Sequence, residues 1–191
     1  QSKFFYRKND RLGGSDLILF MGDDQPPAKS YDLANCVLDL AVRFHVQKVF
    51  TCAAALTRIH HTEQPKVWGV GTNQLMVNDL KRMNLKQKGN LQIAGLNGIL
   101  LGAAKEREID GICLLGEVPQ YASRMPNPMA ALAVLRPLSR MLDIEVDLVE
   151  LGRVAEETRE KMKPAAAVPG LIGFAALEHL GQEAIRLRRR K

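Results

Sequence analysis

The stretch between Gln92 and Tyr121 constrains the fold more than any other part of this chain. It contains a helical apolar stripe at residues 99–109, a helix stop at Asp110-Gly111, and an uninterrupted apolar run at residues 112–115. A strand that is apolar on both faces is typical of a central sheet position covered by helices. The stretch therefore predicts an α/β domain in which Gly116-Glu117 ends a central strand, at the sheet edge where open α/β folds place their sites.

A glycine-punctuated turn precedes this helix. Residues 91–94 form a short apolar run of strand length that Gly95 ends, and Asn97 is positioned to cap the helix that follows. The G-L-N-G turn, with Gly95, Asn97 and Gly98, could bring backbone amides to an anion at a helix start. Glycines that let a helix pack closely on its sheet would explain the same residues without a ligand.

The remainder of the chain continues the alternation of strands and helices. Strands are expected at residues 4–6, 16–21, 49–54 and 67–70, and helices at residues 31–46, 72–83, 127–142 and 147–163. Turn residues between the first two strands predict an antiparallel hairpin. The spacing of the next strand implies a βαβ unit with a right-handed crossover and a largely parallel sheet. Pro137 predicts a kink or break in its helix. Together these elements predict a three-layer αβα sandwich with a largely parallel, mixed sheet.

Two motifs in the central stretch resemble the proteasome assembly chaperone family, in its archaeal and bacterial branch. They are GLNGILLG at residues 95–102 and GICLLGEVPQY at residues 111–121, and the resemblance extends over about residues 16–163. Val118 stands where the family pattern suggests a hydroxyl residue, so no role for that hydroxyl is carried over.

The resemblance implies a phosphorylase/hydrolase-like sandwich and a ring-like homo-oligomer, with a trimer as one option. It implies a cytoplasmic, non-catalytic assembly chaperone or scaffold that binds a protein client, with proteasome-like subunits among the candidates. The alternative is a hydrolase, phosphorylase or ligase-like enzyme with its site at the strand ends near Glu117. The sequence contains no Walker lysine motif, no G-x-S-x-G elbow and no HExxH helix. We therefore predict no catalytic residue.

Eight residues are candidates for contact with a ligand or partner, because they follow predicted strands or belong to the two motifs. They are Asp24, Arg58, Gly95, Asn97, Gly98, Glu117, Pro119 and Tyr121. Glu117 is the carboxylate that an enzyme would use as acid or base. We instead expect it to fix a turn, while Pro119 and Tyr121 shape a contact surface.

Metal binding is not expected. The loop at residues 57–65 carries the adjacent pair His60 and His61, whose side chains diverge on most backbones. A zinc site would need a distant third ligand, such as Glu117 or Asp24. A solvated loop or subunit contact is therefore favoured, and no cofactor is predicted. The three cysteines are widely spaced in apolar surroundings, which predicts reduced, buried thiols: Cys36, Cys52 and Cys113.

The net charge of +6 is concentrated in the last six residues. Without the five basic side chains of the tail, 22 basic residues face 21 acidic ones, so a nucleic-acid partner is not favoured. No apolar run is long enough for a membrane span, so no membrane partner is expected. We expect residues 1–163 to form one sandwich domain lacking its extreme N-terminus. Residues 164–191 should form a linker, a helical extension and a basic tail, and the apolar segment 171–180 favours self-association.

Overall fold

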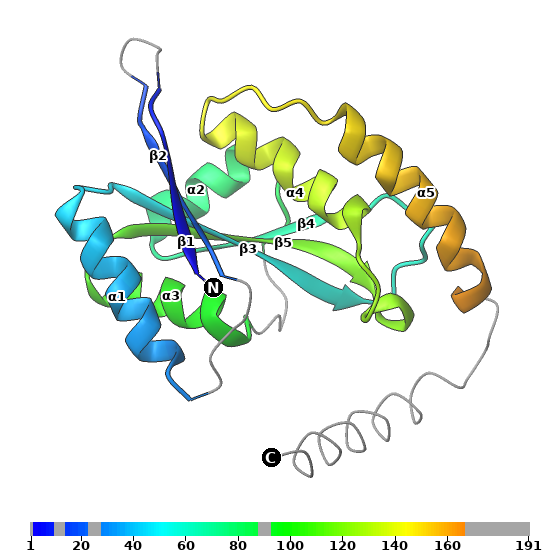
Figure 1. Cartoon of the computed structure of the whole chain (residues 1–191), viewed down its shortest axis with the longest axis horizontal. Helices are drawn as coiled ribbons and strands as arrows, with labels where there is room; N and C mark the ends of the chain where they lie inside the picture. Colours follow the sequence, from blue (N-terminus) through cyan, green and yellow to red (C-terminus); the bar gives the residue numbers. More distant parts are fainter. Residues whose placement is uncertain (1, 10–13, 23–27, 88–92, 167–191) are drawn as a thin grey trace.

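The computed structural model describes residues 2–9, 14–22, 28–87 and 93–166. Within these residues, five strands and five α-helices follow one another, with a 3-10 turn, η1, after the last strand (Figure 1). The elements are β1 (Lys3–Arg7), β2 (Leu17–Met21), α1 (Ser30–Arg43), β3 (Lys48–Thr57), β4 (Val67–Gly71), α2 (Gln74–Arg82), α3 (Gly95–Glu106), β5 (Asp110–Pro119), η1 (Gln120–Ala122), α4 (Pro128–Met141) and α5 (Val149–Ala166).

The central sheet has the strand order β3-β5-β4 and is mixed. β5 pairs in parallel with β3 and antiparallel with β4, and it is buried from Gly111 to Pro119. The predicted central strand is therefore confirmed, but it is longer than residues 112–115. Because β5 continues to Pro119, Gly116 and Glu117 lie within the strand, and the expectation that they end it is wrong.

Alternate side chains of β5 face two different helical layers, which makes the molecule an αβα sandwich. Ile112 and Leu114 belong to a buried cluster with residues of α2 and α4. Cys113 and Leu115 belong to another, with Leu101 of α3. α1 packs on the outside of α3, and α5 packs on α4 (Figure 1). The three-layer architecture predicted from the two-faced apolar strand is confirmed.

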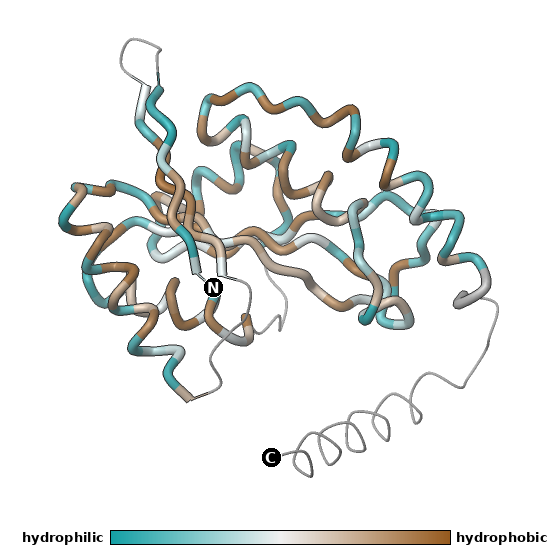
Figure 2. The backbone as a smooth tube through the Cα atoms, viewed as in Figure 1, coloured by the Kyte–Doolittle hydropathy of each residue, from teal (hydrophilic) through white to brown (hydrophobic). Residues whose placement is uncertain are grey.

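The N-terminal hairpin forms as predicted, but it stands apart from the central sheet. β1 and β2 pair antiparallel, with Phe4 opposite Phe20 and Tyr6 opposite Ile18. Within the described residues, β2 pairs with β1 alone, so β2, α1 and β3 do not form the expected βαβ unit in one sheet. The short connection between β1 and β2 favours this local pairing, because its closure costs little entropy. Figure 2 shows that hydrophobic residues lie along both strands of the hairpin.

The helix boundaries follow the capping rules in two cases and depart from them in others. The side chains of Asn73 and Asn127 cap α2 and α4 by accepting from Met76 N and Ala130 N. α3 begins at Gly95, so Asn97 lies inside its first turn and does not cap it as expected. α4 continues through Pro137 without a break. α5 extends to Ala166, three residues beyond the expected boundary.

Two other expectations need correction. Cys113 is buried, but Cys36 and Cys52 are exposed. The reason at Cys52 is that β3 is an edge strand, and one of its faces, with Cys52, Ala54 and Leu56, is left open by the helices. Ile93 and Ala94 are not in a strand, and the rest of the strand expected at residues 91–94 lies outside the described residues. Among the helices described, none has the length and apolar character required to cross a bilayer.

Candidate functional site

Glu117 connects β5 to the start of β4. Its Oε2 accepts a hydrogen bond from the backbone nitrogen of Lys66 at 2.9 Å, and its Oε1 accepts one from Trp68 Nε1 at 3.2 Å. The backbone nitrogen of Glu117 donates in return to the carbonyl of Lys66 at 3.0 Å. The residue is only 7% exposed. Both carboxyl oxygens are therefore engaged in holding β4 against β5.

Tyr121, in the turn η1, holds the other part of the same loop. Its hydroxyl accepts from the backbone nitrogen of His61 at 2.7 Å and lies 2.9 Å from Nδ1 of the same residue. Because the backbone N–H already donates to the phenol oxygen, the hydroxyl proton is available to Nδ1. Nδ1 can accept it only when that ring nitrogen carries no proton. The contact is therefore compatible with a neutral imidazole, and the second lone pair of the phenol oxygen also allows a protonated Nδ1 to donate to it.

The surroundings of His61 favour this neutral form. The residue is 5% exposed, and burial lowers its pKa below the ordinary value of 6.5. Neighbouring side chains contribute less than burial: the basic residues His60, Lys163 and Arg159 lower the pKa further, and Glu160 raises it. Burial is thus the main cause that disfavours a charged imidazole at this position.

The hydrogen bonds from His61 N to Tyr121 and from Lys66 N to Glu117 hold the β3–β4 loop (residues 58–66) in place. His61 is bound near one end of the loop and Lys66 at the other. Pro119 ends β5 directly beside this loop, where it pairs with Thr57, and Arg58 is exposed at the loop's start. The structure therefore brings Arg58 into one region with Glu117, Pro119 and Tyr121.

The glycine motif lies at the start of α3 and contributes in a different way. Gly95 has φ 72°, in the left-handed region that glycine adopts without strain. A Cβ on Gly98 would lie 2.2 Å from the carbonyl oxygen of Ile93, so this position requires glycine for a close backbone approach. Asn97 Nδ2 donates to the carbonyl of Cys52 on β3 at 3.1 Å. These contacts fix α3 to its surroundings without a ligand.

The two motifs meet through apolar packing. Ile93, just before α3, and Trp68, the partner of Glu117, pack against the same buried cluster around Leu115. The last of the eight candidates, Asp24, lies outside the described residues.

The adjacent histidines make other contacts. Their rings lie 4.1 Å apart between centroids, and His60 Nδ1 is 2.7 Å from Thr62 Oγ1. In the part of the chain that the structure describes, no three His, Cys, Asp or Glu side chains converge as a metal site would require.

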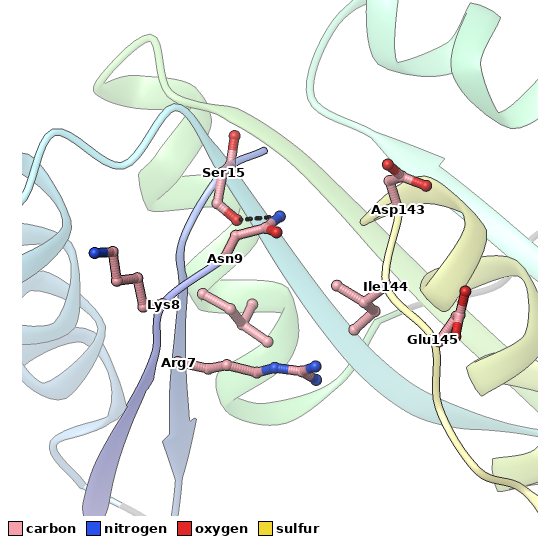
Figure 3. A pocket seen from close by; sticks show the side chains of 8 residues that line it. Arg7, Lys8, Asn9, Ser15, Asp143, Ile144 and Glu145 are labelled. Atoms are coloured by element: carbon pink, nitrogen blue, oxygen red, sulfur yellow. Dashed lines mark hydrogen bonds between the residues drawn. The ribbon is translucent and has the colours of Figure 1, made fainter. Parts of the chain in front are cut away.

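A pocket of about 220 Å³ lies elsewhere, between the base of the hairpin and the segment that follows α4 (Figure 3). Arg7 extends toward Ile144 and Glu145, whereas the ammonium group of Lys8 points away. The side chain of Asn9 bonds to the carbonyl of Ser15 at 3.2 Å and closes one end of the hairpin. None of the candidate residues within the described ranges lines this pocket.

A comparison with protein-family models identifies the family to which this chain belongs. The model of the PAC2 family matches residues 2–166, which include the whole sandwich. The chain belongs to the PAC2 family.

One curated protein and two solved structures illustrate what this chain is similar to. An uncharacterized protein of Methanocaldococcus jannaschii is 30% identical over 154 residues, which cover 77% of this chain and 58% of that protein. The chain thus spans little more than half the length of that relative. Two solved structures from Pyrococcus furiosus are also similar. PbaB, an archaeal proteasome activator, is 26% identical, with a TM-score of 0.76 over 86% of this chain and 71% of its own. PbaA, an archaeal homolog of proteasome-assembly chaperone, is 25% identical, with a TM-score of 0.67 over 78% and 66%.

In this PAC2 chain, sequence reasoning missed the partners of both motif residues. Trp68 is the sole tryptophan, and a largely buried indole N–H needs an acceptor. That requirement could have paired it with the nearest buried carboxylate, Glu117. No comparable signal identifies Lys66, because its backbone nitrogen makes the contact. The sequence predicts a solvated loop or subunit contact around His61, and the contact with Tyr121 is not indicated by it.

Proposed function

We propose that this chain is a non-catalytic, homo-oligomeric assembly chaperone or scaffold, acting in the cytoplasm on subunits of proteasome-type complexes. The observation that carries the proposal is the position of Glu117. Its two carboxyl oxygens hold a backbone amide and an indole, which makes the residue a structural anchor of the β3–β4 loop. A general acid or base instead needs an oxygen that can reach the substrate's proton.

The loop that Glu117 and Tyr121 support has the properties of a binding platform. Its backbone is held at His61 and Lys66, so it can present side chains without a large ordering cost on binding. Exposed polar and charged side chains lie along it, including Arg58, His60 and Glu63. We infer that this loop, together with the segment after η1, contacts the client.

We choose the candidate clients from what the similar proteins PbaB and PbaA are described as doing. PbaB is an archaeal proteasome activator and PbaA a homolog of proteasome-assembly chaperone, and both share the sandwich described above. Proteasome α-subunits and the assembled core particle are therefore the first clients to test.

A direct binding experiment tests the proposal. The full chain is mixed with separately purified α-subunits, and with core particle, from the same organism, and complexes are measured by native mass spectrometry and biolayer interferometry. We expect a complex with at least one of them. Arg58→Glu should weaken binding roughly tenfold, about 1.4 kcal/mol, by reversing an exposed charge on the loop. Arg43→Glu, on an exposed position of α1 away from the loop, is the matched control and should bind as the wild type.

Two results would count against the proposal. One is the absence of any complex with either client at tens of micromolar. The other is hydrolysis of an ester, nucleoside or phosphate substrate that disappears in Glu117→Gln while the variant stays folded, which would identify an enzyme.

A further inference from the structure

A second pocket, of about 190 Å³, lies at the end of the central sheet away from Glu117. β3 and β5 begin here, and α2 and α4, which pack on the same face of the sheet, both end here (Figure 1). A strand rises about 3.3 Å per residue, so the five steps along β5 from Ile112, in the pocket, to Glu117 cover roughly 16 Å. The pocket is therefore separate from the β3–β4 loop and the side chains that support it.

Three cations and one carboxylate line the pocket. Asp79 uses both of its oxygens: Oδ2 lies 3.1 Å from Lys48 Nζ, and Oδ1 lies 2.7 Å from Arg82 Nη2. The third cation, exposed Arg140, has no ion-pair or hydrogen-bond partner for its side chain among the described residues. Asp110, which pairs with Lys48 in the sheet, instead accepts a hydrogen bond from the N-cap residue of α2 and does not line the pocket. The guanidinium of Arg140 is thus the group that a ligand can engage.

Part of this positive charge has a structural role. Lys48 and Arg82 attach α2 to β3 through Asp79. The C-termini of α2 and α4 each carry roughly half a negative charge, which favours cations in their last turns. Three cations, one carboxylate and two helix ends leave a surplus of about one positive charge at the pocket. An anion with a single charge matches that surplus better than a dianion does.

The interior of the pocket is apolar. Ile112 is 1% exposed, and Phe50 and Met141 pack against the buried cluster that contains it. Met83 also lines the pocket. Methionine side chains adapt their shape and make favourable contacts with aromatic rings. An apolar cavity of about 150 Å³ holds a benzene molecule, so a pocket of about 190 Å³ has room for one aromatic ring.

We propose that this pocket binds a small aromatic carboxylate. The carboxylate pairs with the guanidinium of Arg140, whose fork matches two carboxylate oxygens, and the ring packs on Phe50 and Met141. An inorganic anion would leave the apolar interior without a partner, and a neutral ring would leave Arg140 unpaired. The site goes beyond the proposed function, because none of its residues belongs to the β3–β4 loop or to η1.

NMR titrations of the full chain, labelled with 13C at its methionine methyl groups, test this proposal. Benzoate should shift the Met83 and Met141 signals with a dissociation constant on the order of 1 mM, as its few atoms allow. The signals of Met125 and Met129, which belong to the cluster around Tyr121, should not move. Benzamide, which has no charge, and inorganic phosphate, which has no ring, should each bind at least tenfold more weakly than benzoate.

A substitution at the pocket gives a second readout. Arg140→Gln should raise the dissociation constant of benzoate at least tenfold, because it removes hydrogen bonds between charged groups. Lys105→Gln is the matched control: it removes one positive charge at an exposed position of α3, on the other face of the sheet, and should leave the affinity unchanged. The methionine spectrum of each variant shows whether it is folded.

Three results would overturn the proposal. The first is the absence of any shift at Met83 and Met141 with tens of millimolar benzoate. The second is binding of benzamide or inorganic phosphate as tightly as benzoate, which would show an apolar cleft or a simple anion site. The third is a wild-type affinity for benzoate in folded Arg140→Gln. Client binding is measured separately, so none of these results decides the proposed function.

Discussion

The hydroxyl of Tyr121 lies 2.7 Å from the backbone nitrogen and 2.9 Å from Nδ1 of His61, sixty positions earlier in the chain. One phenol thus contacts a backbone donor and a ring nitrogen together. The contact joins the turn after β5 to the β3–β4 loop, and Tyr121 also packs against the buried cluster that includes Ala155 and Met162 of α5. Three segments distant in sequence therefore depend on this one side chain.

Tyr121→Phe should reduce the free energy of unfolding by about 1–3 kcal/mol, because it leaves a buried N–H and a ring nitrogen without partners while preserving the packing. Urea denaturation followed by circular dichroism measures the change. Tyr31→Phe is the control: that hydroxyl bonds to Glu106 at 3.0 Å in an exposed position, and its loss should cost less than about 0.5 kcal/mol. Equal effects of the two substitutions would contradict the role assigned to Tyr121.

Glu117→Gln should also destabilise the fold, by about 1–3 kcal/mol. A glutamine keeps one acceptor oxygen, but its NH₂ group would face either the Lys66 amide or the Trp68 indole, both of which are donors. Glu108→Gln, at an exposed position after α3, should change stability by less than about 0.5 kcal/mol. Thermal unfolding of both variants decides the matter, and an unchanged melting temperature for Glu117→Gln would disprove the anchoring role.

Acidification should destabilise the protein through His61. Its folded-state pKa lies below the ordinary 6.5, so the unfolded chain binds more protons between those two values. The contribution of His61 to stability is therefore complete above about pH 6.5 and is lost as the pH falls through the folded pKa. Urea titrations between pH 7.5 and 5 should show a smaller loss in His61→Asn, whose side chain does not titrate. Identical pH profiles for the two proteins would exclude this linkage.

Two glycines of α3 should respond to alanine in opposite directions. Gly98→Ala should destabilise the protein by about 1–3 kcal/mol, because its Cβ would meet the carbonyl oxygen of Ile93 at 2.2 Å. Gly102→Ala should stabilise it by about 0.5–1 kcal/mol, since no atom lies within 4 Å and alanine favours the helix. Chemical denaturation of the pair provides its own internal control. A stable Gly98→Ala variant would show that the close approach is not required.

The sequence predicted the sandwich because hydrophobic periodicity reports burial directly. The uninterrupted apolar run of β5 required helices on both faces, and both helical layers are present. The motif around Glu117 and Tyr121 could also be located from the sequence, because it comes directly after the apolar run of β5. The partners of these residues could not be predicted, because Lys66 and His61 contribute backbone nitrogens, which every residue type possesses. The pairing of β2 was also missed, since an apolar strand does not specify which sheet it joins.

The strand order β3-β5-β4 has a consequence for the order in which the chain can fold during translation. In the described structure, β3 pairs only with β5, which is synthesised after it, whereas β4 also bridges to Lys86. At about 5–20 residues per second, the roughly 60 residues between the ends of β3 and β5 take on the order of 3–12 s to emerge from the ribosome. During that interval β3, which carries no charge from Val49 to Thr57, has not yet met the strand that it pairs with. The protein is therefore most vulnerable to aggregation before its central strand has left the exit tunnel.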